Sequence, residues 1–415
     1  MYRLRANYFA KVNEMKKVLS ILLSILLVST LVFTVTSCKK DKDTSEALDR
    51  TAVPVTISIE EETDDDGKTY TLTEISLSAL AKDYIDNGKL KNLKELFSEH
   101  SSTDAKHFTV DDTQEKVIFN IPSKVTHIAA NSIVNLSFIT DLVVGPNVVE
   151  IEKGALVGLS GLESITLPFI GGKVGAVNDG KLFSYIFGTI GGDGLTSVTQ
   201  NYNGGTESSA TNYVPTSLKT VTVTGKVDYT KEDVRYYVND DNEHVVLGAE
   251  EAAPEGKTAY TVTSKSYKDS AVQPYAFYGV TTIETVIFTG EITEIPEYTF
   301  YGCAGIKELS FKDTITTIGK YAYANCTSLR VLTLGAVAIE EGAFSGCTSI
   351  GRNTATSIGK LDVSLVTSFG KDAFAGCTSV TKENLTLKAD FESLTEDEQK
   401  ALKDAFGEDF FEDEE

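Results

Sequence analysis

The sequence predicts an α/β, β-rich solenoid made of coils of about 22–23 residues, each with one short strand and one turn or short helix. Two recurring patterns predict this fold. The first is a nine-residue block with an apolar first residue, an aromatic sixth residue and a final cysteine, found at residues 295–303, 318–326 and 339–347. The second is a strand motif, apolar-x-x-apolar-x-apolar, that follows each block, as at Ile306, Leu309 and Phe311. Patterns that recur every roughly 20 to 50 residues indicate stacked units that bury a shared core.

Further copies extend the two patterns over most of residues 125–388. Altered blocks occur at residues 128–136, 151–159, 272–280 and 365–377. Residues 169–271 interrupt the repeat and are rich in glycine, and none of these glycines precedes the Lys-Ser/Thr pair of a phosphate-binding loop. Within this segment, Leu218, Val221 and Val223 form a strand motif without a complete block before it. We therefore expect an insertion among degraded repeats, and an eight-residue insertion near residues 350–358.

The start of the chain has the features of an export signal. Two lysines after Met15, the expected start, precede an uncharged run from Val18 to Ser37, which ends in Val-Thr-Ser-Cys38. This ending resembles a lipobox, in which Cys38 is acylated and becomes the new N-terminus. The alternative is an uncleaved membrane anchor of about 20 residues. Because Cys38 is followed directly by a charged run, the sequence favours an exported, membrane-anchored lipoprotein at the outer membrane or cell surface.

Regions outside the repeats are predicted to cover the exposed end of the first coil and to form an acidic helix and tail at the C-terminus. Residues 53–72 alternate around an Asp-Gly turn, which predicts a hairpin, and two amphipathic helical patterns follow. A Thr395-Glu-Asp-Glu398 capping box predicts a C-terminal helix. The expected organisation is a signal peptide (1–37), a lipidated tether (38–52), an N-terminal cap or small domain (53–120), repeats (121–390) interrupted at about 169–271, and an acidic C-terminal helix and tail (391–415).

Cysteines in the blocks are expected to occupy an apolar position of the core. Leu136, Leu159 and Val280 occupy the same place in other copies, so this position accepts aliphatic residues. A metal-binding or thiolate site would need a Cys-x-x-Cys or a histidine at ligand spacing, and neither occurs. We expect a core ladder of Cys303, Cys326, Cys347 and Cys377, with no metal site and no cofactor. No catalytic motif is recognisable, so we do not expect an enzyme.

Charge and tyrosine content narrow the kinds of partner. The formal net charge is −22, which disfavours nucleic acid and anionic lipid, so contact with a membrane is expected only through the N-terminal anchor. Eleven of the 18 tyrosines lie between residues 201 and 301. Tyrosine is enriched at protein interfaces, whereas Tyr275, Tyr298 and Tyr321 are interpreted as covers of the repeat turns. The candidate binding residues are therefore Tyr229, Tyr236, Tyr237, Tyr260 and Tyr267 in the insertion, with Lys307 and Arg330 on the outer strand face.

The blocks resemble the BspA-like type of leucine-rich repeat of bacterial surface proteins. The resemblance is carried by Ala-Phe-x-Gly-Cys, by Ile-Gly-Lys-x-Ala-Tyr and by Val-Pro-Thr-Ser-Leu-Lys-Thr-Val-Thr-Val. Ordinary leucine-rich repeats place an asparagine three residues after the last strand apolar, where this chain has Glu291, Thr314 and Val337. The carbonyls that this asparagine satisfies must therefore find another donor.

The resemblance implies a surface lipoprotein that binds a protein ligand, through adhesion to host matrix proteins or to other cells. The alternatives are a structural module of an envelope complex and, third, an enzyme of unrecognised type. Among the candidate surfaces the sequence favours residues 226–268, whose deletion is expected to abolish binding. Replacement of Lys307 and Arg330 by alanine is then expected to matter little.

Overall fold

The computed structural model describes residues 48–64, 67–204, 208–225, 234–238, 244–247, 252–257, 260–262, 271–290, 292–310, 315–335, 337–352 and 359–412. The chain divides into two units, Met1–Leu48 and Asp49–Glu415. The expected signal peptide, Cys38 and most of the tether lie outside the described residues, as do Tyr229 and Tyr267. Among the described residues, no helix has the length and apolar character needed to cross a bilayer.

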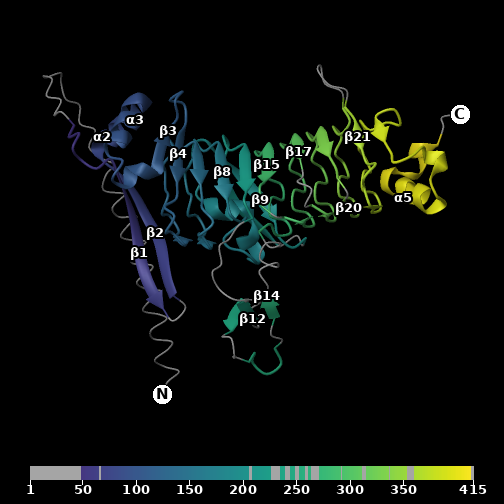
Figure 1. Cartoon of the computed structure of the whole chain (residues 1–415), viewed down its shortest axis with the longest axis horizontal. Helices are drawn as coiled ribbons and strands as arrows, with labels where there is room; N and C mark the ends of the chain where they lie inside the picture. Colours follow the sequence, from purple (N-terminus) through teal and green to yellow (C-terminus); the bar gives the residue numbers. More distant parts are fainter. Residues whose placement is uncertain are drawn as a thin grey trace. The chain divides into compact units, whose positions relative to one another are not determined.

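One face of the repeat region is a sheet to which successive coils each add one short strand (Figure 1). Its central, six-stranded part has the order β15-β11-β8-β6-β4-β3 and is parallel apart from the β3–β4 pair. Two further parallel pairs, β17–β19 and β21–β23, follow along the chain. The strands are β3 (Phe108–Val110), β4 (Val117–Asn120), β6 (Asp141–Val143), β8 (Ser164–Leu167), β11 (Thr220–Val223), β15 (Thr285–Phe288), β17 (Glu308–Ser310), β19 (Val331–Thr333), β21 (Leu361–Asp362) and β23 (Leu385–Thr386). The predicted solenoid of short parallel strands is confirmed.

A second ladder of two-residue strands lies at the start of most of the nine-residue blocks. It has the order β5-β7 near the N-terminal end and β16-β18-β20-β22 farther along, and all these pairs are parallel. The strands are β5 (His127–Ile128), β7 (Glu150–Ile151), β16 (Glu294–Ile295), β18 (Thr317–Ile318), β20 (Ala338–Ile339) and β22 (Ser368–Phe369). Turns rather than helices complete the regular coils, because each block folds back on itself twice.

Two residues in each block have left-handed backbone conformation, and they make these turns. The eighth block residue is always glycine or asparagine, as at Asn135, Gly279 and Gly346. Both residue types tolerate positive φ, because glycine lacks a Cβ and asparagine bonds locally. The fourth residue varies more from coil to coil.

Buried aromatic rings form a column through the core. The sixth block residues of successive coils stack on one another, and Phe183 and Phe406, which lie outside the blocks, extend the column at its two ends; neighbouring ring centroids are 4.7–5.5 Å apart. Backbone hydrogen bonds run parallel to this column, such as Phe300 N–H to the Ala322 carbonyl at 2.7 Å. The column consists of Phe183, Phe277, Phe300, Tyr323, Phe344, Phe374 and Phe406. Each coil therefore buries its aromatic residue only because neighbouring coils cover both ring faces.

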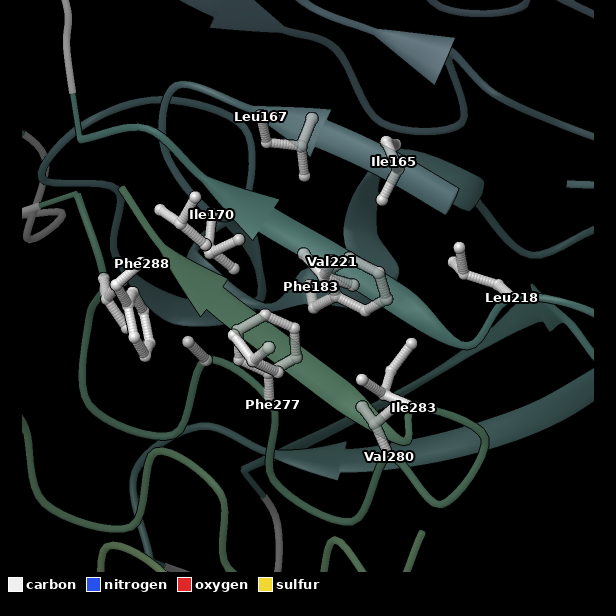
Figure 2. Close-up of a cluster of buried hydrophobic side chains, with 14 of the residues drawn as sticks. Ile165, Leu167, Ile170, Phe183, Leu218, Val221, Phe277, Val280, Ile283 and Phe288 are labelled. Carbon is white, nitrogen blue, oxygen red and sulfur yellow. The ribbon is translucent and has the colours of Figure 1, made fainter. Parts of the chain in front are cut away.

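The central sheet continues through the interruption of the repeat. Strand β11 lies between β8 and β15 in matching register, with Thr220 opposite both Ser164 and Thr285. The side chains of Val221 and Phe183 lie in the core between those of the two flanking coils (Figure 2). This region also contains η2 (Asn178–Lys181), η3 (Phe183–Phe187) and a hairpin of β9 (Leu195–Asn201) with β10 (Ser209–Pro215). Residues 170–225 thus contribute a modified coil to the solenoid.

A small sheet follows β11. Strand β12 (Val234–Val238) pairs antiparallel with both β13 (His244–Leu247) and β14 (Tyr260–Val262). Tyr236 and Tyr237 lie in β12, and Tyr260 lies in β14 (Figure 1).

Elements outside the repeats cover both ends of the row of coils. At the N-terminal end, β2 (Gly67–Leu77) of the hairpin with β1 (Val55–Asp64) pairs with β5. The helices α2 (Ala79–Asp86) and α3 (Leu90–Glu99) and the turn η1 (Asp104–His107) contribute Leu93, Leu96 and other residues to the core. At the C-terminal end, η4 (Phe391–Ser393), α5 (Glu396–Phe406) and η5 (Glu408–Phe411) follow the last coil. The Thr395–Glu398 capping box is present, and Phe374 N–H donates to the Ala405 carbonyl at 2.9 Å.

A tyrosine-lined candidate binding site

Three consecutive coils place tyrosine at the strained fourth position of the block. Tyr275, Tyr298 and Tyr321 have φ values of 66°, 53° and 52°. The equivalent residues in the other coils are Asn131, Gly154, Gly342 and Asp372. Positive φ is unusual for a bulky side chain, and such strain costs on the order of 1–3 kcal/mol. The turn itself therefore does not require tyrosine.

The seventh block position adds two more tyrosines beside the first three. Tyr278 and Tyr301 occupy this position in two of the same coils, where other coils have Val134, Val157 or Ala324. We call Tyr275, Tyr278, Tyr298, Tyr301 and Tyr321 the tyrosine cluster. In both columns of the cluster, tyrosine replaces smaller residues that serve the same turn elsewhere in the chain.

The rings of the cluster form two stacked columns. Tyr275, Tyr298 and Tyr321 stack at centroid distances of 4.9 and 5.2 Å, with interplanar angles of 7° and 22°. Tyr278 and Tyr301 stack at 4.9 Å. The columns lie 5.9 Å apart at Tyr275–Tyr278 and 5.7 Å apart at Tyr298–Tyr301. Stacking is worth about 0.5–1.5 kcal/mol per pair beyond burial, which offsets part of the backbone strain.

A pocket of about 240 Å³ opens over the cluster. All five tyrosines line it, together with Asn201 and Gly204 of the hairpin β9–β10. Tyr275 is 7% exposed, and the other four tyrosines are half-buried. A side chain at position 204 would start 3.0 Å from the Tyr275 hydroxyl, so glycine keeps this side open. At the other end, a Cβ at Gly342 would collide with the Tyr321 ring, so glycine accommodates the end of the longer column.

A buried polar network holds the hairpin against the cluster. Gln200 is fully buried; its Oε1 accepts from Ser184 N–H at 2.9 Å, and its Nε2 donates to the Ala276 carbonyl at 3.0 Å. Asn212, on the partner strand, donates to Ser184 Oγ at 2.9 Å. Because Gln200 precedes Asn201 and Ala276 follows Tyr275, these bonds fix both sides of the pocket relative to each other.

Burial and nearby carboxylates raise the pKa of the phenols above its ordinary value. Burial, with the charge of Glu297, raises the pKa of Tyr275 to about 12. Burial likewise raises the pKa of Tyr278 and of Tyr298. The pKa of Tyr321 rises chiefly because its hydroxyl donates to Glu341 Oε1 at 3.1 Å. These four hydroxyls are therefore neutral near pH 7.

One lysine lies at the edge of the cluster. Lys181 Nζ is 5.3 Å from the centroid of the Tyr275 ring, and burial lowers the pKa of this lysine. Exposed Glu297 is on the same coil as Tyr298, and Lys320 lies 3.4 Å from Glu341. The surroundings are mixed in charge, with carboxylates beside both ends of the longer tyrosine column.

Two of the residues selected from the sequence lie on the outer strand face, away from this pocket. Lys307 forms an ion pair with Glu284, which also lies 3.8 Å from Lys219. The charge of Lys307 is therefore largely compensated. Arg330 is exposed, and no carboxylate lies within ion-pair distance of it among the residues that the structure describes. The Glu284–Lys307 pair spans two coils but leaves little net charge for a ligand.

The four block cysteines are buried and free, and their thiols have hydrogen-bond partners. Cys303 donates to the Phe277 carbonyl at 3.0 Å and Cys326 to the Phe300 carbonyl at 3.2 Å. Cys347 and Cys377 donate to the carbonyls of Tyr323 and Phe344 at 3.0 and 3.2 Å. Burial raises the pKa of all four thiols. Each thiol thus donates a hydrogen bond to a core carbonyl of the preceding coil.

The tyrosine cluster was missed by reasoning from sequence alone. Its signal is present in the aligned blocks, as tyrosine at a position that otherwise holds Gly, Asn or Asp. The tyrosine content of the sequence indicates an interface, but the repeat pattern by itself predicts that the three fourth-position residues cover the turns. Only the backbone φ values and the adjacent hairpin show that these rings line a pocket. Within the described residues, no group of three potential metal ligands occurs.

Comparison with known families agrees with the repeat geometry. A family model described as "BspA type Leucine rich repeat region" matches six copies over residues 71–176 and 270–398, which is more than half of the chain. The chain belongs to this family. Leucine-rich repeats of the BspA type are typically non-catalytic binding modules. The match leaves out residues 177–269, where the coil is modified.

Three solved structures resemble this BspA-type chain at low sequence identity. A leucine-rich repeat protein from Bacteroides ovatus is 17% identical, with a TM-score of 0.26, over 64% of this chain and 59% of that one. A leucine rich cell surface protein from Faecalibacterium prausnitzii is 16% identical, with a TM-score of 0.28, over 68% of this chain and 53% of that one. A leucine-rich repeat protein from Eubacterium ventriosum is 14% identical, with a TM-score of 0.21, over 79% of this chain and 96% of that one.

The chain spans only 59% and 53% of the first two of these structures. No curated protein matches it.

Proposed function

We propose that this chain is a cell-surface lipoprotein whose BspA-type repeats bind a protein ligand, and so adhere to a matrix protein or to another cell. The observation that carries the proposal is the tyrosine cluster. Its backbone strain serves no need of the fold, since four other coils make the same turn with Asn, Gly or Asp. Strain retained at one place is typical of binding sites. Tyrosine also gives rigid, amphipathic contact area with little loss of side-chain entropy on binding.

Anchoring is the part of the proposal that rests on the sequence. The Val-Thr-Ser-Cys38 ending after an uncharged run supports acylation at Cys38. We expect Cys38→Ala to block processing and incorporation of a radiolabelled fatty acid, while the wild-type chain is processed and labelled. Equal labelling of the two chains would show that Cys38 is not the site of acylation.

The test of adhesion uses cells that display the chain on their surface. It measures how many of these cells attach to immobilised extracellular-matrix proteins. The informative variant is Tyr298→Asn/Tyr301→Ala, because both new residues already serve at these positions in other coils. We expect this double variant to be displayed normally and to lose adhesion. Lys307→Ala/Arg330→Ala is the matched control on the strand face and should adhere like wild type.

Deletion of residues 226–268 separates the cluster from the other tyrosine-rich segment. Binding that survives this deletion but not the double variant would assign adhesion to the cluster. Loss of binding in the deletion variant but not in the double variant would assign adhesion to residues 226–268, the segment favoured by the sequence. A chain that adheres to nothing, but cross-links in intact cells to envelope proteins, would be a structural module instead.

A further inference from the structure

We propose that the pocket over the tyrosine cluster binds a proline-rich peptide segment in polyproline II conformation, with basic residues beside the prolines. This inference rests on the proposed function and names the chemistry of its ligand. The lining of five tyrosines and one asparagine supplies aromatic surface and hydroxyl or amide groups, but no metal ligands. Aromatic grooves with such groups are the usual partners of polyproline II segments.

The spacing of the rings matches the repeat of the ligand. The steps of 4.9 and 5.2 Å from Tyr275 to Tyr321 together span about 10 Å. A polyproline II helix has three residues per turn and a rise of about 3.1 Å, so one turn advances about 9.3 Å. Prolines one turn apart would therefore meet Tyr275 and Tyr321, with Tyr298 between them. A pocket of about 240 Å³ is too small for a folded domain but suits a few side chains of an extended peptide.

The hydroxyls of the cluster suit the backbone of such a segment. A polyproline II helix has no internal hydrogen bonds, so its carbonyls remain available as acceptors. The phenols of Tyr275, Tyr278 and Tyr298 are protonated near pH 7, since burial raises their pKa above an ordinary value of 10.0, and a protonated phenol donates a hydrogen bond. The ligand is already extended before binding, so little conformational entropy is lost.

The negative charge of the chain favours a ligand with basic residues beside its prolines. Glu297 lies beside Tyr298, and Glu341 accepts from the Tyr321 hydroxyl. The chain as a whole has a formal charge of −22. The net negative charge of the chain favours arginine or lysine next to the prolines, and exposed Glu297 is the carboxylate that such a residue would approach, because Glu341 is already paired with Lys320 at 3.4 Å.

The test measures fluorescence anisotropy with the full-length chain in detergent. The probe is a labelled synthetic peptide of nine consecutive prolines with one arginine at each end. We expect saturable binding that is at least about tenfold weaker for the Tyr298→Asn/Tyr301→Ala variant. A glycine–serine peptide of the same length and ends should also bind at least about tenfold more weakly, because it lacks the extended conformation. Lys307→Ala/Arg330→Ala should bind like wild type, and thermal melts of all three chains establish that they are folded.

Three results would overturn the inference. The proline peptide could fail to bind wild type, bind the double variant equally well, or bind no better than the glycine–serine peptide. Binding of a neutral hexasaccharide that depends on Tyr298 and Tyr301 would assign the pocket to carbohydrate. Adhesion that is lost in the double variant without any binding of the proline peptide would leave the proposed function standing and reject the ligand named here.

Discussion

At the scale of single residues, the block cysteines show how one side chain serves two demands of a stacked coil. The position must be apolar, since Leu136, Leu159 and Val280 occupy it in other coils. It also lies within reach of a carbonyl in the preceding coil, as in the bond from Cys326 to Phe300. The thiol is a small, weakly polar donor that meets both demands. The Phe300 carbonyl also accepts from Cys303 N–H at 3.1 Å, so it keeps a partner when Cys326 is replaced.

The cysteines make alkaline pH destabilising. Burial raises the pKa of each thiol above its ordinary value of 9.0, so above pH 9 the unfolded chain loses these protons first. Their contribution to stability is therefore complete below about pH 9 and declines as pH rises toward the folded pKa. Each thiol adds a slope of up to about 1.4 kcal/mol per pH unit.

Cys326→Val checks this slope by urea unfolding at pH 8 and pH 10.5. At pH 8 the substitution should cost less than about 1.5 kcal/mol, as a nearly volume-conserving change. Above pH 9 its free energy of unfolding should fall less steeply than that of wild type. Equal slopes would contradict the assignment of a raised pKa to Cys326. A marked loss of stability on adding a reductant or a chelator would contradict the free-thiol core itself.

At the scale of elements, regular coils were predictable and the modified coil was not. The turns and the sheet dictate the spacing of the side chains in the block and in the strand motif. The positions of the regular coils therefore follow from the sequence pattern. The hairpin β9–β10 alternates as well, but two of its inward positions hold Gln200 and Asn212. Buried amides make an inward strand face look solvent-exposed in sequence. The role of these amides is visible only in the structure. Gln200 pairs with the backbone of Ser184 and Ala276, and Asn212 donates to the Ser184 hydroxyl.

Gln200 is expected to hold the β9–β10 side of the pocket in place. Gln200→Ala leaves Ser184 N–H buried without its acceptor, which costs about 1–3 kcal/mol. Because Asn201 is the next residue and Gly204 follows in the turn, that side of the pocket should loosen and ligand binding should weaken. Thr199→Ala is the matched control, since Thr199 is exposed on the same strand and bonds only across the hairpin to Thr211.

Two measurements check the role of Gln200. Hydrogen exchange over residues 195–215 should rise in Gln200→Ala and not in Thr199→Ala. The dissociation constant of the proline peptide should also rise in Gln200→Ala and stay unchanged in Thr199→Ala. Faster exchange with unchanged binding would show that the hairpin side of the pocket contributes nothing to recognition.

At the scale of the whole unit, stability follows the row of coils. Each coil contacts mainly its neighbours, so the stability of a solenoid is nearly a sum of coil and interface contributions. The family pattern lapses between residues 177 and 269, yet β11 keeps the sheet continuous and Phe183 stacks on Phe277 at 4.8 Å. The modified coil thus joins the coils before it to those after it. It also carries the hairpin that lines the pocket.

The last prediction concerns this junction. We expect Asp49–Glu415 to melt in one main calorimetric transition, because the core is continuous across the modified coil. Phe183→Ala removes a fully buried ring at the junction and should cost about 3–5 kcal/mol. Since the loss falls on the interface between two groups of coils, the transition should divide into two. Phe119→Ala, which removes an equally buried ring in β4 near the N-terminal end, should lower the midpoint while leaving one main transition. A wild-type chain that already melts in two steps would show that the modified coil does not couple the coils on its two sides.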